Sequence, residues 1–380
     1  MLVRCLSIQA ALAVPLLVAG CGSSSSAETE GARAGAGDSG VIVEGVERIP
    51  SEPARTNGRG SAFEVSLADF LLGRPGEDVA MVPGVSDLAL GENRVTFLVL
   101  RGDASPVLSP TARVLVGRVD APLAVPGEPD GFGDALKETP FTINPSMVDG
   151  TPLAETQARL ITIGAAAGRA GTAADAPGES APADETAAEL DVEHLYVARV
   201  TFHEPGVYWL VAEPEGADVQ ALRFLQVRAY PVSPAVGDRA FPSENPTLDD
   251  AQAREITTQR PPAIELLRYS VKQSLEASVP FVVTFATPAF CLSRICGPVV
   301  DVLDEVRAEL EGTGVRFIHI EIYHENDPAR GINEWVQEWR LASEPWTFIV
   351  DGAGVIRDRF EGAFSSEELR RSIVEHLVDA

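Results

Sequence analysis

The sequence predicts two folded parts, an antiparallel β domain followed by an α/β domain, and three observations support this division. Between residues 61 and 230, short runs rich in Val, Leu, Phe and Tyr are bounded by Gly, Pro and Asp, and no helical pattern of comparable strength interrupts them. From residue 263 to residue 380, helical and strand patterns alternate instead. A segment rich in proline, 231–262, separates the two regions and predicts a semi-rigid linker.

The N-terminal residues predict export and lipid anchoring. Residues 1–21 combine Arg4, an apolar run over 10–18 that is too short for a membrane span, and the sequence Val18-Ala19-Gly20-Cys21. This segment resembles the signal peptide and lipobox of bacterial lipoproteins, which implies lipidation at Cys21 and a place on the extracytoplasmic face of the cell membrane. The alternative is an ordinary cleaved signal peptide with an incidental cysteine. Residues 22–60 are small and polar and predict a flexible stalk.

Charge and cysteine content limit the functions to be considered. The chain carries 56 acidic and 30 basic residues, a net charge of -26, which repels nucleic acid and anionic lipid head groups. Of its four cysteines, Cys5 lies in the signal segment and Cys21 at the lipidation position. Cys291 and Cys296 remain, and in an oxidising compartment such a pair forms a disulfide or cycles through one.

The region 61–230 is expected to be a sandwich of antiparallel strands. An Ala/Gly-rich segment at about 164–190 predicts a disordered insert within it. The stretch PGVYWLVAE, residues 205–213, resembles the penultimate strand of immunoglobulin-like domains, which implies an immunoglobulin-like β-sandwich. The expected strands are 95–100, 112–119, 195–202, 207–212 and 222–229.

In the region 263–380, the expected order is helix, strand, helix, strand, helix, strand, strand, helix. The first helix carries apolar residues at 264, 267, 271 and 275 on one face, and the last begins with a capping box of Ser365 and Glu368. The strand at 315–323 is apolar on both faces, so it is expected inside a sheet covered by helices. The other expected elements are a strand at 281–286, a helix ending near Gly312, a helix at 329–341 and a hairpin of 345–350 with 355–360.

The cysteine pair is expected to lie between a buried strand and a helix. Cys291 and Cys296 follow the apolar run 281–285 and precede a helical pattern, and helix-end N–H groups stabilise a thiolate. The stretch 280–305 resembles the thioredoxin active site, with C-x4-C in place of the family's C-x2-C. The resemblance implies an α/β thioredoxin-like fold over 263–380, with Cys291 as the attacking thiol and Cys296 as the resolving one.

A second stretch carries the same resemblance. Residues 344–351, EPWTFIVD, are similar to the x-P-T-x-F-x-x-D stretch of bacterial membrane-anchored thiol-disulfide oxidoreductases, which implies that Pro345 is cis and faces the cysteines. Thioredoxins also carry a buried acid on the first strand, where Val283 and Thr284 stand in this chain. Proton transfer is therefore expected to be slower or to use another group.

Three alternatives to thiol–disulfide exchange remain open. The first is a structural disulfide in a thioredoxin-like binding module, and the second is a peroxiredoxin-like peroxidase. A copper site of the cysteines with His319 or His324 is the third alternative. The expected partners are protein thiols or disulfides outside the cytoplasm, with no cofactor and no metal.

Overall fold

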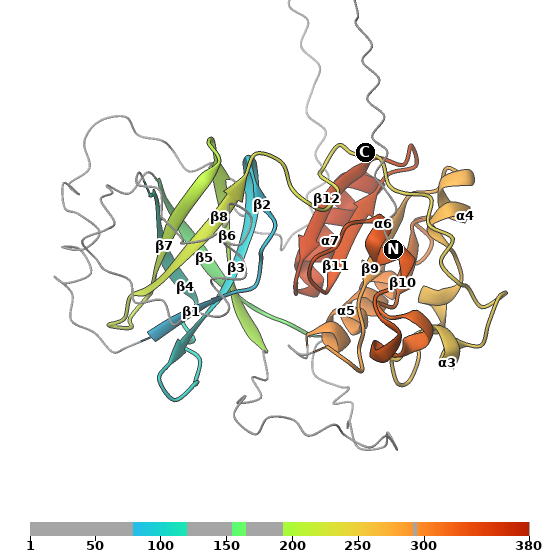
Figure 1. Ribbon diagram of the computed structural model, residues 1–380, viewed down its shortest axis with the longest axis horizontal. Helices are drawn as coiled ribbons and strands as arrows, with labels where there is room; N and C mark the ends of the chain where they lie inside the picture. The colour runs from blue at the N-terminus through green and yellow to red at the C-terminus, as the bar shows by residue number, and fades with distance from the viewer. Residues whose placement is uncertain (1–78, 120–153, 165–192, 292–294, 380) are drawn as a thin grey trace, which may run out of the picture. The chain divides into compact units, whose positions relative to one another are not determined.

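A computed structural model describes residues 79–119, 154–164, 193–291 and 295–379. The predicted signal segment, the lipidation position Cys21 and the stalk all fall within residues 1–78, which lie outside the described residues. Most of the predicted insert at about 164–190 lies outside them as well. The chain is a mixed α/β protein with one large curled sheet and one smaller sheet (Figure 1). No helix of the described residues is both long and apolar enough to cross a membrane.

The large sheet contains eight strands in the order β1-β3-β6-β5-β4-β7-β8-β2. All neighbours pair antiparallel except β2 and β8, and β1 also contacts β8 because the sheet curls. The five predicted strands are present, and the prediction missed β1, β2 and β5. The bounds are β1 Val79–Pro83, β2 Leu88–Ala89, β3 Gly91–Arg101, β4 Thr111–Arg118, β5 Ala154–Thr162, β6 His194–Phe202, β7 Gly206–Pro214 and β8 Ala221–Arg228.

Strand alternation divides the apolar residues of this sheet between its two faces. In β4, Val114 and Val116 enter the main core, while Leu115 between them packs with Trp209 and Val211 on the other face. The expected sandwich is two packed sheets, whereas these strands form one hydrogen-bonded sheet that curls around its own core. Closing one sheet over a core buries the same apolar face that a second sheet would cover.

The small sheet has the order β10-β9-β11-β12 and is buried on both faces. Strands β9 and β10 are parallel, and β11 is antiparallel to both β9 and β12. The side chains of Val282 and Ile349 pack with α5 and α7, whereas Val283 and Phe348 pack with α6 and with α4, the helix Val271–Glu276. The bounds are β9 Phe281–Phe285, α5 Cys296–Glu309, β10 Arg316–Ile320, α6 Glu334–Glu338, β11 Trp346–Val350, β12 Ile356–Glu361 and α7 Ser366–Ile373.

The helix expected over 264–275 is broken into two short elements, the 3-10 turn η2 Ile264–Leu267 and the helix α4 Val271–Glu276. Ser270 starts α4 as its N-cap, because its side chain accepts a hydrogen bond from the Gln273 N–H at 3.1 Å. The helix expected over 329–341 is likewise only the short α6, with the 3-10 turns η3 His324–Asn326 and η4 Pro328–Arg330 before it. A further short helix, α3 Ala253–Ile256, lies in the proline-rich segment, and a π-turn, η5 Val374–Val378, follows α7.

Polar contacts join residues of the large sheet to the C-terminal elements. The Arg94 guanidinium donates to the Glu368 carboxylate of α7 at 2.8 Å and to the Ala363 carbonyl at 2.9 Å. The Glu361 carboxylate at the end of β12 accepts hydrogen bonds from the Ser86 backbone N–H at 2.9 Å and the Ser86 hydroxyl at 2.6 Å. Of the capping box predicted for α7, the bond from the Glu368 N–H to the Ser365 hydroxyl is present at 3.2 Å, whereas the Glu368 carboxylate binds Arg94 instead.

Candidate functional site

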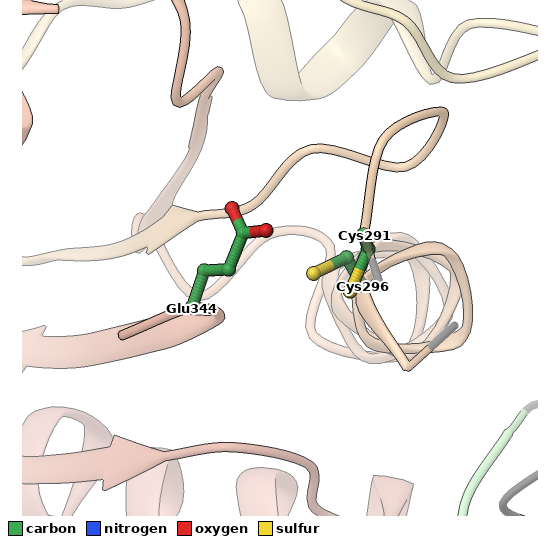
Figure 2. Close-up of side chains that lie close together, drawn as sticks. All are labelled: Cys291, Cys296 and Glu344. Atoms are coloured by element: carbon green, nitrogen blue, oxygen red, sulfur yellow. The ribbon is translucent and has the colours of Figure 1, made fainter. Parts of the chain in front are cut away.

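The two cysteines lie together between β9 and α5, as expected. One ligand atom of each of Cys291, Cys296 and Glu344 lies within 4.8 Å of those of the other two, and Figure 2 shows this group. Both cysteines are reduced. Cys291 is 8% exposed and Cys296, the first residue of α5, is fully buried. The looped segment expected between them includes 292–294, which lie outside the described residues.

Pro345 is cis, as the resemblance implied. It stands just before β11, whose first residue, Trp346, pairs with Phe285, the last residue of β9. Two segments therefore lie at the same end of these paired strands. One leads out of β9 toward Cys291, and the other enters β11 through Pro345. This strand pairing brings residues 344 and 345 to the cysteines across more than forty positions of sequence.

Glu344 is a site residue that the sequence interpretation missed. Burial, with smaller contributions from the negative charges of Cys291 and Glu321, raises the pKa of its carboxyl to about 7. Its Oε2 atom is buried and has no hydrogen-bond partner. The signal was present in the sequence, because Glu344 directly precedes the proline that the resemblance placed against the cysteines.

The Cys296 thiol is strongly held in its protonated form. A hydrogen bond with the Cys291 side chain raises the pKa of Cys296, and burial and the charges of Cys291 and Glu344 raise it as well. A hydrogen bond with the Thr287 backbone has the opposite, smaller effect. The expectation that the helix start would stabilise a thiolate is therefore not met at Cys296. The reason is that this side chain is buried against acidic groups.

Other buried polar atoms lie around the group. Glu321 is 5% exposed and accepts hydrogen bonds at Oε1 from the Thr258 backbone N–H and hydroxyl, while its Oε2 has no partner. The Thr287 hydroxyl is also buried without a partner. Tyr323 has a pKa raised by burial and by the charges of Glu344 and both cysteines. Among the described residues, no basic group contributes to the shifts at Glu344 and Cys296.

The position on the first strand where thioredoxins carry an acid is occupied by a neutral pair. Thr284 and Thr347 are fully buried and stand opposite each other on β9 and β11, with their hydroxyl oxygens 2.8 Å apart. These hydroxyls bond to each other. The strand behind the cysteines therefore supplies no carboxyl, as the sequence predicted.

Neither candidate histidine joins the cysteines. His319 is buried, with its Nε2 3.0 Å from the Ala286 carbonyl oxygen and a pKa lowered by burial. His324 lies on the surface, 3.4 Å from Glu334. Among the described residues, the group formed by Cys291, Cys296 and Glu344 therefore contains no histidine.

Comparison with known proteins identifies no relative: no family model matches the chain, and no curated protein matches it. The site is therefore interpreted from its own geometry, a buried, reduced cysteine pair beside the carboxyl group of Glu344, which directly precedes a cis proline.

Proposed function

We propose that this protein exchanges thiols and disulfides through Cys291 and Cys296. The observation that carries the proposal is the placement of two reduced sulfurs next to each other and beside the Glu344–Pro345 peptide. A dithiol in this arrangement is close enough to close into a disulfide and open again. Its substrates are thiols or disulfides of other proteins outside the cytoplasm.

The two cysteines have different roles in this proposal. Cys291 retains some exposure and is preceded by Phe290, which is 40% exposed, so a partner sulfur reaches Cys291 first. Cys296 is fully buried at the start of α5 and resolves the mixed disulfide. The Glu344–Pro345 peptide, beside the two sulfurs, positions the partner's strand in this proposal.

The proposal includes the fold family and the location. The order β9, α5, β10, α6, β11, β12, α7 supports a thioredoxin-like domain. The lipobox resemblance at Cys21 supports a lipid anchor on the extracytoplasmic face of the membrane. Cys21→Ser should release the protein from membranes or leave it unprocessed, and a processed, membrane-bound Cys21→Ser protein would contradict the anchor.

Trapping of mixed disulfides tests the proposed function. Cys296→Ser should accumulate mixed disulfides through Cys291, while Cys291→Ser, the matched control, should accumulate few. Alkylation after mild reduction, read by mass spectrometry, should label Cys291 in the folded protein. If neither thiol is labelled before unfolding, or if the potential lies below about -300 mV, the pair is a structural disulfide. Rapid turnover of hydrogen peroxide would favour the peroxidase instead.

A further inference from the structure

We propose that Glu344 is the proton acceptor for Cys296 when the mixed disulfide is resolved, a role that rests on the proposed exchange function. The sulfur of Cys296 and a carboxyl oxygen of Glu344 lie within 4.8 Å, a separation that one water molecule bridges. Oε2 of Glu344 is buried and has no other partner to hold it. The carboxyl group is therefore available to the thiol.

The need for such a group follows from the burial of Cys296. This thiol is fully buried and has a raised pKa, so it cannot lose its proton directly to water. The paired strands β9 and β11 carry Thr284 and Thr347, whose hydroxyls bond to each other and do not ionise near neutral pH. Among the described residues, Glu344 is the only carboxyl grouped with both sulfurs.

The surroundings of Glu344 suit it to this role. The titratable groups that act on it or respond to it are Cys291, Cys296, Glu321 and Tyr323, and all four are acids. Burial, followed by the charges of Cys291 and Glu321, raises its pKa to about 7, where a carboxyl both accepts and releases a proton at neutral pH. Glu321 keeps its own place through its bonds to Thr258 and adds to the negative charge.

The proposed step balances as follows. Cys291 has attacked a partner disulfide, so a Cys291–partner S–S bond exists and the first partner thiolate has left and taken a proton from water. The proton of Cys296 then passes to the Glu344 carboxylate while the Cys296 sulfur attacks the Cys291 sulfur. The Cys291–Cys296 bond forms, and the second partner sulfur leaves with the electron pair and is protonated by solvent. The protein dithiol is oxidised, the partner disulfide is reduced, and Glu344 returns its proton to water.

Reaction with an aromatic disulfide, dithiobis(nitrobenzoate), separates the two steps. The full chain, with Cys5→Ser and Cys21→Ser in every sample, is reduced and mixed with the reagent. Attack by Cys291 releases one thionitrobenzoate, and closure by Cys296 releases a second, so the coloured product appears in two phases. The first phase reports attack and the second reports the step assigned to Glu344.

Glu344→Gln should lower the rate of the second phase by about 10- to 100-fold and change the first by less than about threefold. In the unmodified site the second-phase rate should rise with pH through an inflection above the ordinary carboxyl value of 4.5, because burial and the charge of Glu321 still act on Glu344 when Cys291 is in the mixed disulfide. The carboxylate is the active form, so Glu344→Gln should lose that inflection. Glu344→Asp keeps a carboxyl and should retain it. Glu311→Gln is the matched control, because Glu311 is exposed beyond the opposite end of α5 and should leave both phases unchanged.

A second phase that is equally fast in Glu344→Gln, with the same pH profile, would overturn the role of Glu344 and leave the exchange function standing. Release of fewer than two equivalents by the unmodified site would overturn both. If Glu344→Gln does not fold, the pH profile of the unmodified site decides, since the absence of any inflection between about pH 4.5 and 7 contradicts the proposal.

Discussion

Replacing Thr347 by valine should destabilise the protein, because it leaves the hydroxyl group of Thr284 buried without a hydrogen-bond partner. The hydroxyls of Thr347 and Thr284 are 2.8 Å apart, and both side chains are fully buried between β11 and β9. Thr347→Val removes one hydroxyl and leaves the Thr284 hydroxyl buried without a partner, at a cost of about 1–3 kcal/mol. The methyl group gained by valine returns about 0.8 kcal/mol. We expect a net loss of about 1 kcal/mol in the free energy of unfolding.

The double variant separates this explanation from a simple packing effect. Thr284→Val alone should cost a similar amount, whereas Thr284→Val with Thr347→Val leaves no unpaired hydroxyl and gains two buried methyl groups. Its stability should lie within about 1 kcal/mol of the unmodified protein, which gives a coupling free energy of about 2 kcal/mol between the two positions. Thr347→Ser, which keeps the hydroxyl, is the control for the loss of the bond.

Urea unfolding followed by tryptophan fluorescence measures these differences, because Trp339 and Trp346 lie in the apolar cluster on one face of the same small sheet. The transition of this fluorescence should move to lower urea in each single variant and return in the double variant. Additive losses in the double variant would refute the reasoning, because they would show that each hydroxyl has a partner of its own.

Three further predictions concern charge and packing. Because the pKa of Glu344 is raised in the folded state, the native protein binds more protons than the unfolded chain between about pH 4.5 and 7. The free energy of unfolding should therefore fall as pH rises through that window. Denaturation measured across this pH range should show a smaller fall in Glu344→Gln. Arg94→Met leaves the Glu368 carboxylate, whose side chain is 18% exposed, without the guanidinium that pairs with it. We expect the free energy of unfolding to fall by about 3 kcal/mol at pH 7 and by less at acid pH. An equal fall at both pH values would show that the ion pair is not the cause. Gly117→Ala places a Cβ atom 2.0 Å from the buried ring of Trp209, so it should unfold the large sheet at lower temperature, whereas Gly102→Ala, with open space around its Cβ, should change the midpoint little.

The local elements were largely predictable from the sequence. The strand patterns at 95–100 and 281–286 depend on alternation or burial within a few residues, and both are strands in the structure. The start of α7 at Ser365 and the cis bond at Pro345 also have short sequence signals. The helices around 264–275 and 329–341 were overestimated, because an apolar spacing near 3.6 is also satisfied by separate short turns that pack on the same sheet.

The sequence by itself determined that Cys291 and Cys296 follow a buried strand and precede a helix, because these relations depend only on neighbouring residues. Only the tertiary structure decided what surrounds them. Glu344 reaches the cysteines because β11 pairs with β9 in one register, and the same register brings Thr347 against Thr284. The curled form of the large sheet is likewise a result of closure over a common core. Strand pairing and closure join residues far apart in the chain, and their energies depend on the whole packed core, which no local pattern of residues records.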